Sequence, residues 1–295
     1  MKSLSIACFA VLLLAGCAIH EGVPDGARDL KTAPYKTSVQ RGLLFTPANW
    51  PEKLRADIWL PRGLGPYSAV LLIHGNSWAG GDRNDMHDIA EALARKGYIA
   101  VSIDYRLAPK YRFPAALQDA QQALRWLRAH AESYGIDPQR IGVFGYAGGA
   151  QIAALLGTVN DNDVLDTPYG GADTRVRAVV AGALPADLAD LSDSDDVTQY
   201  LGATLSENEA LYGQASPLNH VSPGDAPFFL YHGSWDQTTP VSQSERMKTA
   251  LDQAGVPAEI YIIQGLGHVA LPFFDGGMVD QAIHFLDRHL RNEEP

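Results

Sequence analysis

Short apolar runs alternate with amphipathic stretches along most of this chain, and that alternation limits the folds it can adopt. Between the runs, apolar residues recur at helical spacing, as in the stripe that starts at Ala116 and ends at Leu127. Continuous apolar runs separated by helices are typical of a mostly parallel sheet with helices on both faces. The sequence therefore predicts the α/β class, with strands at residues 54–61, 68–75, 98–105, 140–145, 176–183, 227–233 and 258–265.

The chain of 295 residues shows no internal repeat and no second composition regime. We therefore expect a single domain at residues 35–295. Residues 184–225, between two predicted strands, are polar and helix-prone. This segment is predicted to form a small helical cap inserted into the domain.

The N-terminal residues have a different character from the rest. Lys2 precedes a short apolar run and then small residues, which is typical of a secretory signal peptide at residues 1–16. Its end, Leu14-Ala15-Gly16-Cys17, resembles the lipobox of bacterial lipoproteins. That resemblance implies acylation of Cys17 and an exported chain, lipid-anchored in the bacterial envelope, at the outer membrane or periplasmic face. An ordinary signal peptide with a chance cysteine is the alternative, and residues 17–34 are expected to be a tether.

Charge and cysteine content exclude several classes of function. Acidic residues outnumber basic ones by 34 to 23, and no basic run occurs, which argues against a nucleic-acid partner. The two cysteines, Cys8 and Cys17, both lie in the N-terminal segment. The domain is therefore expected to have no disulfide and no cysteine-based metal site.

The stretch VFGYAGGAQIAALLG, at residues 143–157, is predicted to form a buried strand, a tight turn and a helix. It is nearly the nucleophile elbow of serine hydrolases, Gly-x-Ser-x-Gly. Gly145 and Gly149 occupy the two glycine positions, but Ala147 stands where the serine is expected. An alanine side chain has no atom that can attack a carbonyl.

Several further segments carry a family resemblance: DYRLAP, FPAALQDA and YGIDPQRIGVFGY, at residues 104–109, 113–120 and 134–146. Together they resemble α/β-hydrolase-fold esterases and lipases, especially carboxylesterases near the hormone-sensitive-lipase and feruloyl-esterase-like groups. The resemblance covers about residues 50 to 290. The helix after Ala147 stays in step with these relatives without a gap, so the alanine is a substitution and not a shift in register.

The resemblance also implies the other catalytic positions. The segment that follows the 227–233 run matches the family pattern His-Gly-x-x-Asp-x-x-x-Pro, which makes Asp236 the acid. His268 follows the last predicted strand, and the order nucleophile, acid, histidine is that of α/β hydrolases. We expect His268 Nδ1 to face Asp236 and Nε2 to face Ala147.

The segment HGNSWAGGD, residues 74–82, resembles the His-Gly-Gly-Gly-Trp loop of bacterial carboxylesterases. The resemblance implies an oxyanion hole made by the backbone N–H groups of Asn76, Ser77 and Gly148. Asn76 reaches left-handed backbone angles readily, and Ser77 does so less readily. A glycine-rich turn without a role is the alternative.

Other polar segments are interpreted as structural. Residues 160–163 lack the glycine and the terminal glutamate of a calcium loop and are expected to be solvated. The acidic residues 192–196 could border a cleft, but a solvated face is preferred. Asp104, Tyr105 and Arg106 are expected to form a turn or a buried ion pair. No metal and no cofactor are expected.

Three interpretations of function remain open at this level. The chain is an esterase whose nucleophile was replaced by design or by natural variation, although a retained signal peptide argues against design. Alternatively it is a natural pseudoenzyme that binds a small-molecule ester, an acylated glycan or a lipid without cleaving it. A hydrolase that uses a different chemistry is the third interpretation, and no spare cysteine or metal cluster supports it.

Overall fold

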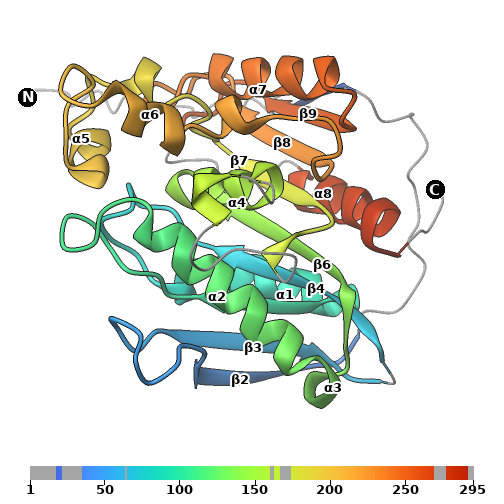
Figure 1. Cartoon of the computed structure of the whole chain (residues 1–295). Coiled ribbons are helices and arrows are strands. Elements are labelled where there is room, and N and C mark those ends of the chain that lie inside the picture. Colours follow the sequence, from blue (N-terminus) through green and yellow to red (C-terminus); the bar gives the residue numbers. More distant parts are fainter. Residues whose placement is uncertain are drawn as a thin grey trace, which may run out of the picture.

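The computed structural model describes residues 18–21, 35–63, 65–159, 163–166, 174–268 and 277–291. These residues form one nine-stranded sheet with the strand order β1-β9-β8-β7-β6-β4-β5-β3-β2 (Figure 1). The predicted α/β class and α/β-hydrolase architecture are confirmed. Cys17 and the predicted signal peptide lie outside the described residues.

The central strands are parallel and the outer ones are antiparallel. The parallel block consists of β4 to β9, while β3 pairs antiparallel with β5, and β2 with β3. The strand bounds are β1 Ala18–Glu21, β2 Thr37–Leu44, β3 Arg55–Pro61, β4 Tyr67–Ile73, β5 Ile99–Ile103, β6 Ile136–Tyr146, β7 Val179–Gly182, β8 Phe228–Gly233 and β9 Ala258–Ile263.

Helices cover both faces of the sheet, as the alternation predicts. Helices α1 and α8 pack with one face, and α2, α4 and α7 pack with the other (Figure 1). The helix bounds are α1 His87–Arg95, α2 Ala115–Ala129, α3 Ala131–Tyr134, α4 Gly148–Thr158, α5 Asp195–Leu201, α6 Glu209–Ala215, α7 Ser242–Gln253 and α8 Met278–Leu286. No helix among the described residues is long and apolar enough to cross a membrane.

Two edge strands were not predicted from the sequence. β2 is mostly exposed, so it lacks the apolar run that marks the buried strands. β1 lies inside the segment that we expected to be an irregular tether, and it pairs antiparallel with β9. Without β1, the edge of β9 would carry unpaired backbone groups, which favours pairing with a passing segment.

The parallel strands bring four loops to one edge of the sheet. β4, β6, β8 and β9 all run in the same direction, so the segments that follow Ile73, Tyr146, Gly233 and Ile263 emerge together. In open α/β sheets, ligands bind outside the carboxyl ends of the strands. The segment predicted as the cap contains α5 and α6, which lie together in Figure 1.

Helix α4 lies unusually close to the strands at its first turn. A Cβ atom added to Gly149 would lie 2.2 Å from the Ile73 carbonyl oxygen and 2.3 Å from that of His74. We expect Gly149→Ala to lower the free energy of unfolding by about 3 kcal/mol, because backbone atoms cannot yield as a side chain can. Urea denaturation of the purified protein measures this change.

Gly213 provides the matched control for that substitution. It lies within α6, where an added Cβ would meet only Asn219 Nδ2 at 3.6 Å, an ordinary contact distance. Gly213→Ala is expected to raise stability by up to about 1 kcal/mol, because alanine favours the helix. Equal effects at the two positions would contradict the close approach at Gly149.

Candidate active site

The backbone at Ala147 has the strained conformation of a strand-to-helix turn. Its φ and ψ angles are 50° and −119°, a region that non-glycine residues rarely occupy. The Ala147 N–H donates to the Gly182 carbonyl at 2.8 Å, and its own carbonyl accepts from Ala150 N at 2.9 Å. Such backbone strain costs about 1–3 kcal/mol. The turn therefore keeps a demanding geometry although residue 147 carries no hydroxyl.

Glycines permit the close contacts around this turn. A Cβ at Gly145 would lie 2.2 Å from the Gly149 carbonyl oxygen. A Cβ at Gly75, in the neighbouring loop, would lie 2.9 Å from the Tyr146 carbonyl oxygen and 3.2 Å from the Ala147 Cβ. The absence of a side chain at Gly75 thus lets residues 74–82, called the 74–82 loop below, approach Ala147.

The 74–82 loop contains three consecutive non-glycine residues with left-handed backbone. The φ angles of Asn76, Ser77 and Trp78 are 70°, 53° and 57°. Each such residue costs about 1–2 kcal/mol, and Ser77 and Trp78 lack the local advantages of asparagine. Within the described part of the chain, the backbone N–H groups of Asn76, Ser77 and Gly148 donate to no protein acceptor. They are thus available to a ligand oxygen.

His268 and Asp236 form a hydrogen-bonded pair. His268 Nδ1 lies 2.7 Å from Asp236 Oδ2. Asp236 is buried, and its Oδ1 accepts from the backbone N–H groups of Thr238 and Thr239 at 2.9 and 2.8 Å. With the Nδ1 proton donated to the carboxylate, His268 Nε2 is left as the basic nitrogen.

Two neighbours of this pair were assigned no role in the site from the sequence. His232 is fully buried, and its Nε2 lies 3.3 Å from Asp236 Oδ2 and 2.8 Å from the Thr239 carbonyl oxygen. Tyr146 donates its hydroxyl to the His268 carbonyl oxygen. The sequence signal for His232 was the His-Gly pair of its motif, which we interpreted as part of a turn. Tyr146 occupies a variable position of the elbow and carried no signal.

Hydrogen bonds keep Asp236 ionised in spite of its burial. Burial alone would raise the pKa of this carboxyl group. Hydrogen bonds from His232 and His268, and from the Thr239 N–H, favour the charged form and hold the pKa of Asp236 well below its usual range. The charged Asp236 accepts the Nδ1 hydrogen bond and so fixes the orientation and the tautomer of the His268 ring.

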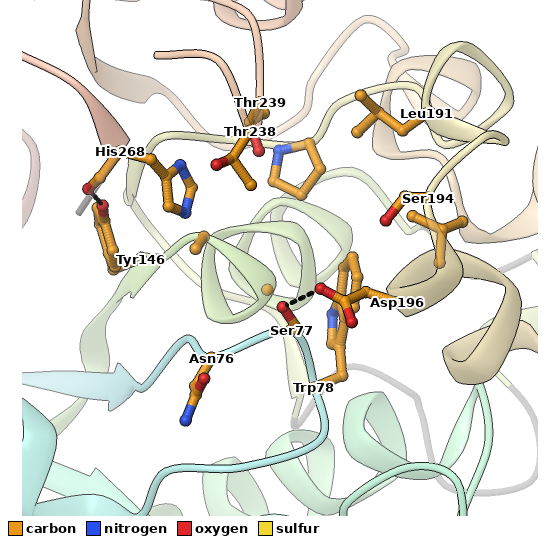
Figure 2. A pocket seen from close by; sticks show the side chains of 14 residues that line it. Asn76, Ser77, Trp78, Tyr146, Leu191, Ser194, Asp196, Thr238, Thr239 and His268 are labelled. Atoms are coloured by element: carbon orange, nitrogen blue, oxygen red, sulfur yellow. Dashed lines mark hydrogen bonds between the residues drawn. The ribbon is translucent and has the colours of Figure 1, made fainter.

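These groups meet at one cavity of about 410 Å³. It is lined by five of the six residues that the sequence placed in the catalytic site: Asn76, Ser77, Ala147, Gly148 and His268. Asp236 lies behind His268 as its hydrogen-bond partner. Figure 2 shows His268 and Tyr146 on one side of the cavity and Ser77 on the other.

The cap contributes the remaining wall of the cavity. Leu191, Ser194, Asp196 and Val197 line it. Asp196 is exposed, as the interpretation of residues 192–196 as a solvated face expects, but it also borders the cavity, where its Oδ2 accepts a hydrogen bond from Ser77 Oγ at 2.6 Å (Figure 2). An acidic run shows no periodicity from which one member could be selected, and the fold of the cap decides which side chain reaches the edge of the cavity.

The turn after β5 has a structural role, as expected. Arg106 and Asp119 form a buried ion pair with a 2.8 Å contact between Arg106 Nε and Asp119 Oδ1. Asp104 pairs with Arg83 at 2.8 Å. Neither pair contains a residue that lines the cavity at Ala147.

The amino-acid sequence of this chain is similar to those of known esterases. The model of the family described as BD-FAE matches residues 56–251, which is more than half of the chain. Esterase LipQ of Mycobacterium tuberculosis is 29% identical over 218 residues, covering 70% of this chain and 51% of LipQ. Probable carboxylic ester hydrolase LipM of the same organism is 30% identical and covers 70% of this chain and 50% of LipM. The chain thus spans about half the length of these curated relatives.

Solved structures agree on the fold. A truncated form of a carbohydrate esterase from gut microbiota has a TM-score of 0.77 at 24% identity, covering 88% of this chain and 98% of that one. A bifunctional GH43-CE protein of Bacteroides eggerthii has a TM-score of 0.75 at 25% identity, covering 85% of this chain and 38% of that one.

The strain at Ala147 leads to a stability prediction. Ala147→Gly is expected to raise the free energy of unfolding by about 1 kcal/mol, because glycine relieves the left-handed strain and this gain exceeds its extra entropy in the unfolded chain. Ala150→Gly, three residues along in the regular part of α4, is expected to lower it by about 1 kcal/mol. Guanidinium denaturation of both variants measures the free energy of unfolding. A lower value for Ala147→Gly than for the unaltered chain would refute the claim that the backbone at Ala147 is strained.

Proposed function

The chain belongs to the BD-FAE family of α/β-hydrolase carboxylesterases, and we propose that its pocket binds carboxylic esters without forming an acyl-enzyme, because residue 147 is alanine. The observation that carries this proposal is the intact geometry around Ala147. The strained turn, the His268–Asp236 pair and the free N–H groups all persist beside the cavity. Only the nucleophilic oxygen is absent.

The arrangement suits an ester carbonyl. The N–H groups of Asn76, Ser77 and Gly148 are available to hold the carbonyl oxygen, which would place the carbonyl carbon over Ala147. His268 Nε2 would then face the reacting bond. With a serine at this position, His268 would take the hydroxyl proton during attack and return it to the leaving alcohol, while Asp236 held the ring.

With alanine, that sequence of steps cannot start. His268 has no hydroxyl to deprotonate and can act only on water. Loss of the serine in a serine hydrolase lowers kcat by a factor on the order of 10⁶, while roughly 10³–10⁴ of acceleration over water remains from binding and the oxyanion hole. We therefore propose that binding, with at most slow hydrolysis, is the activity of the chain as it stands.

The proposed ligands are small-molecule esters or acylated glycans. The cavity of about 410 Å³ is of the size that holds a small organic molecule. Its wall mixes apolar side chains with hydroxyl groups, as an acyl chain and a polar alcohol would each require. The similarity to LipM, a probable carboxylic ester hydrolase, and to the bifunctional GH43-CE protein supports the same class of ligand.

Restoring the serine tests this proposal. We expect Ala147→Ser to raise the rate of p-nitrophenyl acetate hydrolysis by a factor on the order of 10⁵–10⁶, because the hydroxyl enters a site already built for it. Release of p-nitrophenol measures the rate. The unaltered chain should bind p-nitrophenyl butyrate in calorimetry, with a Kd at or above the KM of the Ala147→Ser variant for the same ester, because an accumulating acyl-enzyme lowers KM below Kd.

Two variants control this experiment. Ala147→Gly also changes residue 147 but supplies no hydroxyl, and the double variant Ala147→Ser, His268→Ala supplies a hydroxyl without its base. Neither variant should hydrolyse p-nitrophenyl acetate at the raised rate expected of Ala147→Ser. An Ala147→Ser variant no faster than the unaltered chain would refute the site, and an unaltered chain as fast as the variant would require a different nucleophile.

We also propose that the chain is exported and anchored by a lipid on Cys17 in the bacterial envelope. The lipobox-like Leu14-Ala15-Gly16-Cys17 after a signal-like apolar run supports this location. Acyl chains bound to one cysteine would hold the protein at a membrane surface. Expression in a bacterial host with radiolabelled palmitate should label the full chain and not its Cys17→Ala variant, and equal labelling of the two would refute the anchor.

A further inference from the structure

The left-handed backbone of the 74–82 loop needs contacts that hold it in place. The loop supplies some of these itself, since Ala79 N and Gly80 N both donate to the Asn76 carbonyl oxygen, at 3.1 and 3.2 Å. The Trp78 carbonyl oxygen also accepts from Ala108 N at 2.9 Å. None of these bonds involves the Ser77 side chain, which belongs to the middle residue of the strained run.

Helix α5 of the cap contacts Ser77 and Trp78, the two residues of the loop for which a left-handed backbone is most costly. Ser77 Oγ donates to Asp196 Oδ2 at 2.6 Å. The Trp78 ring stacks on Tyr200, with ring centroids 4.3 Å apart and planes 5° from parallel. Asp196 and Tyr200 are four residues apart, so they lie on the same face of α5.

Helix α4 also contacts both aromatic rings of this arrangement, through Gln151. Gln151, on the first turns of α4, accepts from Trp78 Nε1 at 3.1 Å and from the Tyr200 hydroxyl at 3.3 Å. Gln151 also donates to the Ala215 carbonyl oxygen of α6 at 2.7 Å. The helix that begins at the elbow, the cap and the 74–82 loop are therefore joined through buried polar contacts at one glutamine.

We propose that helix α5 sets the shape of the oxyanion hole, with Asp196 as a positioning residue that holds Ser77 in its left-handed conformation. The carboxylate acts through Ser77 and not on the ester itself. The Ser77–Asp196 hydrogen bond is exposed at the edge of the cavity, and a carboxylate acceptor makes it stronger than a bond between neutral groups in the same place. When Asp196 is lost, the Ser77 N–H turns away from the carbonyl oxygen.

This inference rests on the proposed function only for its kinetic test. In the Ala147→Ser background, we expect Asp196→Ala to lower kcat for p-nitrophenyl acetate about 10-fold and to change KM less than about 2-fold, because displaced donors lose mainly transition-state contacts. Asp196→Asn keeps an acceptor for Ser77 and should recover most of the activity. Ser77→Ala should match Asp196→Ala, and the double variant should be no worse than either single one.

Asp195→Ala is the matched control, because it removes an exposed carboxylate from the same turn of α5. It should leave kcat unchanged. A change in KM alone would mean that Asp196 contacts the substrate, and additive losses for Ser77→Ala and Asp196→Ala would mean that the two act separately. Either result would overturn the proposal.

Hydrogen–deuterium exchange tests the same inference without any activity. In the chain as it stands, Asp196→Ala should speed amide exchange in peptides covering residues 74–82 about 5-fold, since the loop opens more often. Asp195→Ala should not change it. Unchanged exchange in the Asp196→Ala variant would overturn the proposal, whereas an inactive Ala147→Ser variant would count only against the proposed function.

Discussion

The close packing of helix α4 against the ends of β4 and β6 is the contact on which the rest of the site depends. Gly145 and Gly149 have no room for a side chain, since an added Cβ at either would lie 2.2 Å from a carbonyl oxygen. This approach forces the chain through the turn at Ala147, with φ of 50° and ψ of −119°. It also places the N–H of Gly148, the first residue of α4, beside the cavity. The strained turn is therefore a consequence of packing and is independent of the serine hydroxyl.

That independence explains why the site survives without its nucleophile. The His268–Asp236 pair is held by the buried His232 and by the backbone N–H groups of Thr238 and Thr239, and none of these contacts involves residue 147. A serine and an alanine differ by one oxygen atom, so the exchange leaves the core volume nearly unchanged. Stability and ligand binding can thus persist where the covalent step is lost.

The cap takes part in the site as well as covering it. Asp196 contacts Ser77 and Tyr200 contacts Trp78, two strained residues of the 74–82 loop. Gln151 of α4 accepts hydrogen bonds from Trp78 and Tyr200. A strained segment persists only when its surroundings over-determine it. The shape of the cavity and the direction of the free N–H groups are therefore set by three elements that are distant in the sequence.

The sequence by itself determined the local features. Apolar runs and helical periodicity predicted the α/β class, and the resemblance of short motifs to those of α/β-hydrolase esterases implied Ala147, Asp236 and His268, which the structure brings to one site. These are short-range patterns, because the elbow and the loops after each strand keep their own spacing. Only the tertiary structure decided that Asp196 reaches Ser77, 119 residues away, and that His232 contacts Asp236. Such partners depend on how helices and loops pack in three dimensions, which no linear pattern in this chain records.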